Sequence, residues 1–158
     1  MILQISNRTT FLNTNTWDSV PGPPMNTART LHGCATASYN GSLHVFVVGG
    51  MNDSSDNHAP SLDTIEVFNV NKEKWIKDFR TTKLPQPLEG HQVVQASSPN
   101  FFVYAVGGSN QGVNFSSTIY GLDRSKQWEK IGDLDTERYI HATINIGQRN
   151  SIPDCTGK

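Results

Sequence analysis

Two hydrophobic strands in this chain each end in a glycine pair, and the landmarks around the two pairs match. Val47-Val48 leads into Gly49-Gly50, and Ala105-Val106 leads into Gly107-Gly108. A histidine precedes each pair and a tryptophan follows it, and one more tryptophan and one more histidine extend the pattern at its two ends. The landmarks occur in the order Trp17, His32, Gly49-Gly50, Trp75, His91, Gly107-Gly108, Trp128 and His141. Recurrence in register indicates copies of one structural unit.

The repeated unit resembles the kelch repeat, which has a period of roughly 50 residues and folds as one four-stranded blade of a β-propeller. The resemblance covers nearly the whole chain, from about Thr9 to Ile146. It implies an all-β fold with about two complete four-stranded blades and partial blades at both ends. It also implies action by surface recognition rather than by a chemical reaction.

The landmarks predict the boundaries of the units. We expect residues 1–8 to be an N-terminal extension, residues 9–20 the end of a blade, residues 29–78 and 88–131 two blades, residues 138–150 the start of a blade and residues 151–158 an irregular tail. Propellers close with about four to eight blades, so we expect this chain to be part of a larger propeller. The tail lacks the next return strand and glycine pair, which suggests a truncated sequence.

Turn and strand signals support this pattern within the units. Asn40-Gly41 is a strong signal for a two-residue hairpin, because both positions tolerate positive φ. The return strand over residues 43–48 is nearly all apolar, so it should be buried on both faces. Pro21-Gly22-Pro23-Pro24 is expected to break regular structure between two units. The tryptophan of each unit is expected to cover the apolar face between neighbouring blades.

Composition excludes several classes of partner. The 13 Lys and Arg residues balance 14 Asp and Glu residues, which argues against a surface for nucleic acid or anionic membrane. No apolar stretch reaches the roughly 18 to 20 residues of a membrane span, and the N-terminus lacks a signal-peptide core. We therefore expect a cytoplasmic protein, with an extracellular location as the alternative if a signal peptide is missing from this chain. The sequons at Asn7, Asn40, Asn52 and Asn114 are about as frequent as chance predicts, and Cys34 and Cys155 are expected to be free thiols.

Motifs for catalysis or cofactor binding are not evident. The glycine pairs have neither the spacing nor the following helix of a phosphate-binding loop, and a structural role in a strand-end bend is favoured. The histidines and cysteines lack metal-ligand spacing, so we expect no metal and no cofactor, and His32, His91 and His141 should share one structural role. The enzymatic alternative is a fragment that resembles galactose oxidase, whose copper site lies on a kelch-type propeller. The residue types for it are Tyr39, Tyr104, Tyr120 and Tyr139 with Cys34.

Polar loops on the expected rigid frame are the better candidates for function. Each glycine pair is followed by an irregular polar segment, at residues 51–61 and 109–114. Two arginines lie three residues before a repeat histidine, and Arg suits bidentate binding of carboxylates, although a scaffold role with bonds to backbone carbonyls is an equal alternative. The candidate partner-binding residues are Arg29, Asn52, Asp53, Ser54, Asp56, His58, Asn110, Gln111 and Arg138.

The resemblance therefore implies a non-catalytic protein–protein interaction module. Within the family, such modules resemble actin-bundling scaffolds or the substrate-recruiting subunits of ubiquitin ligases. The expected partners are proteins, together with neighbouring blades of a larger propeller or other copies of this chain. Nucleic acid is not expected as a partner.

Overall fold

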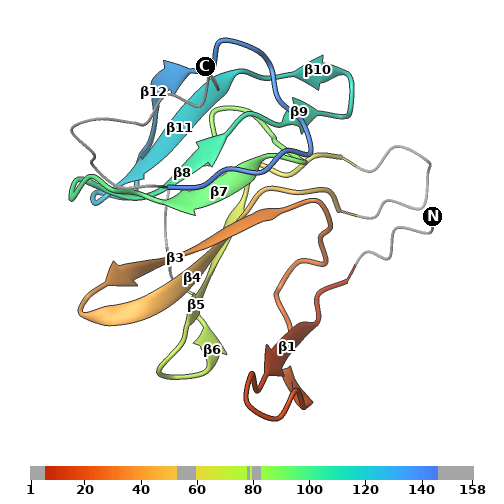
Figure 1. The fold of residues 1–158 in the computed structure, drawn as a ribbon, viewed down its shortest axis with the longest axis vertical. Helices are drawn as coiled ribbons and strands as arrows, with labels where there is room; N and C mark the ends of the chain where they lie inside the picture. Colours follow the sequence, from red (N-terminus) through yellow and green to blue (C-terminus); the bar gives the residue numbers. More distant parts are fainter. Residues whose placement is uncertain (1–5, 53–59, 78, 80–82, 146–158) are drawn as a thin grey trace, which may run out of the picture.

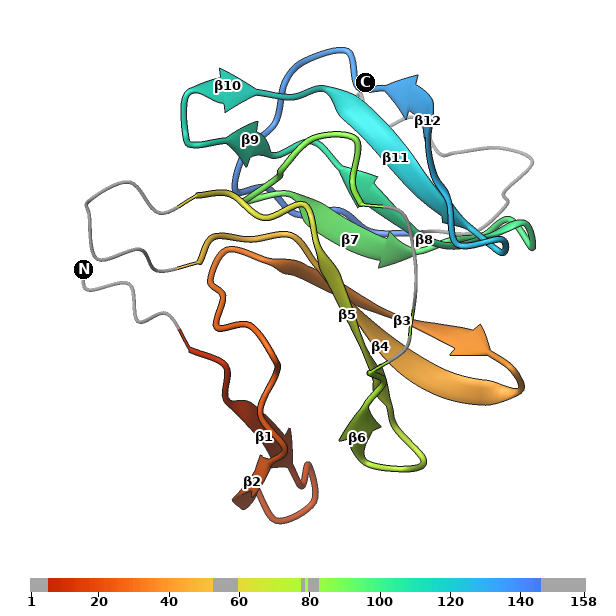
Figure 2. The same cartoon turned by 180° about the vertical axis from the view of Figure 1, so that it is seen from behind.

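The computed structural model describes residues 6–52, 60–77, 79 and 83–145, and these residues form strands and loops with no helix. Two four-stranded antiparallel sheets lie one against the other, and a separate two-stranded hairpin lies beside the first of them (Figures 1 and 2). The expected all-β architecture of four-stranded antiparallel blades is confirmed. No helix that is long and apolar enough to cross a bilayer occurs in the described part of the chain.

The first sheet is a simple meander with the strand order β3-β4-β5-β6. Its strands are β3 (Gly33–Tyr39), β4 (Ser42–Val48), β5 (Ile65–Asn69) and β6 (Lys74–Trp75). Asn40 and Gly41 connect β3 to β4 with φ of 48° and 70°, which is the two-residue turn that the sequence predicts. Burial of β4 is complete only in its second half, because Phe46 and Val48 are fully buried whereas Leu43 is 44% exposed.

The second sheet repeats this meander, and its strand order is β12-β11-β8-β7. Its strands are β7 (Gln92–Gln95), β8 (Phe101–Val106), β11 (Thr118–Asp123) and β12 (Trp128–Asp133). A small hairpin of β9 (Ser109–Asn110) and β10 (Asn114–Phe115) interrupts the connection from β8 to β11. We call the sheet that contains β3 blade one and the sheet that contains β7 blade two.

The N-terminal hairpin pairs β1 (Thr9–Leu12) with β2 (Ser19–Gly22). The predicted break at residues 21–24 begins later than expected, because Pro21 and Gly22 still belong to β2. Proline is tolerated there since β2 pairs only with β1, and an edge strand does not need every N–H group.

The three tryptophans do not share one environment. Trp128 is 8% exposed and belongs to the core, and Trp75 packs on Phe68 and donates its indole N–H to the Pro23 carbonyl at 2.9 Å. Trp17 is 74% exposed, so the expected packing role is wrong for this residue. It lies in the turn before β2 at φ 62°, outside the strand that would have directed its ring toward a sheet face.

An aromatic cluster joins the two blades. Phe46 of β4 stacks on Phe102 of β8 with 5.3 Å between ring centroids, and the Tyr39 ring meets Phe102 edge-on at 5.7 Å. The Arg124 guanidinium lies 4.3 Å from the centroid of the Phe102 ring and donates a 2.7 Å hydrogen bond to the Ser38 carbonyl of blade one. One continuous core therefore spans both sheets and holds their loops in fixed relative positions.

We predict that the isolated 158-residue chain self-associates. The hairpin exposes Leu12 by 52% and Val20 by 57%, and Ile140 and Ile144 are exposed by 64% and 81% at the other end of the described chain. In repeat folds each unit packs on its neighbours, so the outermost faces remain uncovered. Sedimentation velocity at increasing protein concentration should show a rising mean mass. A single monomeric species across the concentration range would contradict this expectation.

Candidate functional site

Most of the described candidate residues lie at one end of the two blades. The connections from β4 to β5 and from β8 to β11 emerge there, together with the segments that lead into β3 and β7, on the right-hand side of Figure 1. We call this the loop end. The two-residue turn between β3 and β4 and the turns before β6 and β12 lie at the other ends of these strands.

The segments that lead into successive units make the same backbone hydrogen bonds. In each segment, one backbone N–H group donates to a carbonyl just before the two outer strands of the preceding unit. A second N–H group, four residues later, donates to the carbonyl of the residue before that acceptor. The first bonds are Met25 to Asn7 at 2.8 Å, Leu84 to Asp63 at 2.9 Å and Leu134 to Ser117 at 2.7 Å. The second bonds are Arg29 to Ser6 at 3.1 Å, Leu88 to Leu62 at 3.1 Å and Arg138 to Ser116 at 3.2 Å. Arg29, Leu88 and Arg138 therefore occupy equivalent positions, as their distance from the repeat histidines indicates.

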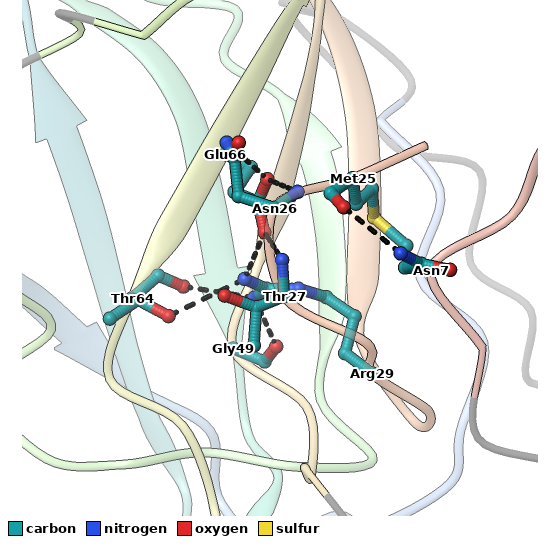
Figure 3. A network of polar contacts seen from close by, with 8 residues as sticks. All are labelled: Asn7, Met25, Asn26, Thr27, Arg29, Gly49, Thr64 and Glu66. Atoms are coloured by element: carbon teal, nitrogen blue, oxygen red, sulfur yellow. Dashed lines mark hydrogen bonds and ion pairs between the residues drawn. The ribbon is translucent and has the colours of Figure 1, made fainter. Parts of the chain in front are cut away.

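Arg29 is buried inside blade one (Figure 3). Its guanidinium donates to the Gly49 carbonyl at 2.8 Å and forms an ion pair of 2.7 Å with the Glu66 carboxylate. The same carboxylate accepts the backbone N–H groups of Asn26 at 2.7 Å and Thr27 at 3.0 Å. The proposed contact of Arg29 with a partner is therefore corrected: the residue is 2% exposed, and its donors hold the segment that enters β3.

Blade two has uncharged side chains at the positions of this ion pair. Leu88 takes the position of Arg29 and is fully buried, and Tyr120 of β11 takes the position of Glu66 of β5. The exchange of both members together supports the scaffold interpretation, because either charge alone would be buried without its counterion. Arg138 differs from both equivalents. It is exposed, and its guanidinium makes no hydrogen bond or ion pair with another described residue.

Each glycine pair is enclosed by two histidines. A Cβ atom on Gly49 would lie 2.8 Å from Cε1 of His91 in the next unit, and one on Gly50 would lie 2.9 Å from Cβ of His32 in its own unit. Blade two repeats the arrangement with Gly107 against His141 at 3.0 Å and Gly108 against His91 at 2.7 Å. The repeat glycines and histidines thus have one shared structural role, which is close packing of the segment between units.

His91 lies at the centre of this arrangement and is 1% exposed. Burial, together with the neighbouring His32, lowers the pKa of His91 to about 4. Burial also lowers the pKa of His32 and of His141, and nearby Arg29 and Arg138 add to the two effects. At neutral pH the three rings are therefore uncharged.

The loop candidates fall into two groups. Asp53, Ser54, Asp56 and His58 lie outside the described residues. Asn52 is half-buried, and its N–H group bonds the Pro60 carbonyl at 3.3 Å. Asn110 is the last residue of β9, and the exposed Gln111 follows it in the turn to β10, where it adopts φ 56°.

Two further residues at the loop end, Ser61 and Glu89, were not among the candidate residues, although Ser61 ends the predicted polar segment at residues 51–61. The Ser61 hydroxyl donates a 2.8 Å hydrogen bond to the Glu89 carboxylate and accepts the Gln111 N–H at 2.8 Å. The sequence contained one signal for Glu89: the equivalent positions in the other units are Thr30 and Tyr139, and neither is acidic. Ser61 links the loop of blade one to the hairpin of blade two, so Asn52, Asn110 and Gln111 belong to one connected surface.

Two residues of the enzymatic alternative, Tyr39 and Cys34, lie on opposite faces of β3. Tyr39 faces Phe102 of blade two, whereas Cys34 lies on the other face of β3 and lines a hollow of about 720 Å³ with Phe11 and Trp75. Burial raises the pKa of the Cys34 thiol. Within residues 6–52, 60–77, 79 and 83–145, no three His, Cys, Asp or Glu side chains are grouped as metal ligands.

Repeated four-stranded antiparallel meanders, joined by equivalent segments and packed so that β3 lies against β7 and β8, are blades of the β-propeller class. The Kelch motif family matches residues 30–77, which contain all four strands of blade one, β3 to β6. A comparison with curated proteins found no match.

Proposed function

We propose that this chain is a non-catalytic protein-interaction module that binds a partner protein at its loop end. The observation that carries the proposal is the joining of the loops of two blades by the bonds of Ser61 to Glu89 and Gln111. Binding residues commonly lie on loops that a rigid scaffold positions, and here the scaffold is the shared core of the two blades. A scaffold protein or a substrate-recruiting adaptor in the cytoplasm is the biological role that we propose for such a module.

The side chains at the loop end suggest the chemistry of the partner. Asn110 and Gln111 carry primary amides that can donate to a peptide carbonyl and accept from a peptide N–H. Arg138 extends the surface, because its carbonyl accepts the N–H of Gly108 at 2.7 Å, directly before β9. An exposed guanidinium selects carboxylates, and Arg29 shows that an arginine at this repeat position can bind one. An extended protein segment that carries an acidic residue fits this set of groups.

The test compares two double variants on opposite ends of the blades. Partners captured with the whole chain are identified, and their dissociation constants are measured with Arg138→Ala/Gln111→Ala and with the matched Lys72→Ala/Asn100→Ala at the far turns. A charged hydrogen bond contributes about 1.5–3 kcal/mol, so we expect the first variant to bind at least about tenfold more weakly. The second should bind as the wild type does. Unchanged affinity in a folded Arg138→Ala/Gln111→Ala variant would place recognition elsewhere.

A further inference from the structure

Glu89 and Ser61 form a buried polar connection between the two blades at the loop end. Glu89 is 2% exposed and Ser61 is 8% exposed, and they come from segments that are 28 residues apart in the chain. The Gln111 N–H can only donate and the Glu89 carboxylate can only accept, so the Ser61 hydroxyl accepts from Gln111 and donates to Glu89. The direction of both hydrogen bonds is therefore determined by the groups that take part.

The backbone positions both residues independently of this connection. The N–H and carbonyl of Glu89 each bond Ser109 at 2.9 Å, so Glu89 lies beside the base of the β9–β10 hairpin. Ser61 pairs with Met51 in an antiparallel bridge, and the neighbouring Leu62 N–H bonds the Gly50 carbonyl at 2.7 Å. Two anchored residues thus hold the tip of the hairpin through the Gln111 N–H.

The hairpin needs such support. β9 and β10 pair over only two residues each, and hairpins this short are marginally stable in water. Gln111 adopts φ 56°, a conformation that costs a non-glycine residue free energy unless its surroundings favour it. The bond from Gln111 to Ser61 provides a specific interaction that favours this conformation.

The connection is not part of the repeat scaffold. Thr30 and Glu89 are equivalent, because Thr30 pairs with Met51 and Glu89 pairs with Ser109, each just after a glycine pair. Tyr139 occupies the third equivalent position, so only one of the three residues carries a carboxylate. Scaffold contacts, such as the bonds of Arg29, Leu88 and Arg138 to the preceding unit, recur in every described junction. A feature that occurs once, beneath Asn110 and Gln111, has a role specific to this surface.

We infer that Glu89, acting through Ser61, is a positioning residue that orders the β9–β10 hairpin against the bridge of Met51 and Ser61 in blade one and so presents Gln111 and its neighbours as one preorganised recognition surface. Preorganisation reduces the entropy lost when a loop is immobilised by a partner. The inference rests on the proposed function for its biological meaning. The positioning itself is measurable in the chain alone.

The experiment is amide hydrogen exchange of the whole chain, followed by NMR or mass spectrometry. Ser61→Ala should raise the exchange rate of the Gln111 amide about fivefold or more, because it removes a hydrogen bond from that N–H. Glu89→Gln should raise it less, since its amide oxygen can still accept from Ser61. Ser98→Ala, which removes a serine bond to the Asn100 N–H at the far end, should leave the Gln111 rate unchanged.

The amide of Val103, in the core of blade two, reports any global change in each variant. A Gln111 rate that rises no more than the Val103 rate, or that stays at the wild-type value, overturns the positioning role whatever the binding experiment gives. A selective rise at Gln111 supports it. If that rise is found while Arg138→Ala/Gln111→Ala binds partners normally, the proposed recognition surface fails and the positioning role stands.

Discussion

Gly49→Ala is expected to lower the free energy of unfolding by about 3 kcal/mol or more. Gly49 has φ 59°, which costs an L residue about 1–2 kcal/mol. The new Cβ would also lie 2.4 Å from the Leu88 carbonyl oxygen and 2.8 Å from Cε1 of His91. Both neighbours belong to the segment that enters blade two, and overpacking of this kind costs about 1–3 kcal/mol.

Gly41→Ala is the matched control for this substitution. Gly41 has φ 70°, but no atom lies within 4 Å of the position that its Cβ would take. Gly41→Ala therefore adds only the cost of the left-handed conformation, and we expect it to lower the free energy of unfolding by about 1 kcal/mol. Urea unfolding followed by tryptophan fluorescence measures both variants. Equal losses would mean that the segment between units can move away from Gly49, and that the glycine pair is required only for its backbone conformation.

A repeat pattern in the sequence reveals those interactions that are local and recur from unit to unit. The spacing of the glycine pairs, the Asn40-Gly41 turn and the apolar return strands predicted the two meanders, because these signals act locally and are repeated. The pattern also indicated that the repeat histidines share one structural role. That this role is packing against glycines of two units could be seen only when the units were placed side by side.

Arg29 and Trp17 show the limits of that inference. Arg29 occupies the same repeat position as the exposed Arg138, yet Glu66 lies close enough in blade one to bind it and makes it a scaffold residue. The relevant partner lies 37 residues away in the chain and on another strand, so the local sequence around Arg29 does not reveal it. Trp17 matches the other tryptophans in spacing, but it lies in the turn before β2 and not in a strand, which the spacing does not reveal.

The connection of Ser61 to Glu89 and Gln111 illustrates the converse problem. Its three members come from three different segments and do not recur in other units, so neither local propensity nor the repeat could predict it. Only the unusual acid at the position of Thr30 and Tyr139 distinguished this junction. Departures from a repeat are therefore the positions where specific function should be sought in such chains.

Acidification from about pH 6.5 to pH 4 is expected to lower the free energy of unfolding by about 3 kcal/mol through His91 alone. Its pKa is about 4 in the folded chain, against 6.5 for an unperturbed histidine. The unfolded chain therefore binds a proton in this range that the folded chain does not, and each pKa unit corresponds to about 1.4 kcal/mol. The full stability is present above pH 6.5, it falls as the pH is lowered through this window, and below about pH 4 the loss through His91 stops growing.

His91→Leu tests the assignment, since leucine fills an apolar site without titrating. The variant should lose most of the pH dependence between pH 6.5 and pH 4, and the remainder should come from His32 and His141, whose pKa values are lowered in the same direction. Acidic groups act in a different window. Lys130 holds the pKa of Asp133 below 3.8, so stabilisation by that carboxylate is lost only at lower pH. Urea midpoints measured at pH 7, 5.5 and 4.5 lie above the window of Asp133, so their change with pH reports the histidines. If His91→Leu keeps the wild-type slope over this range, the proton is taken up elsewhere in the unfolded chain, and the packing of His91 between Gly49 and Gly108 does not make the fold sensitive to acid.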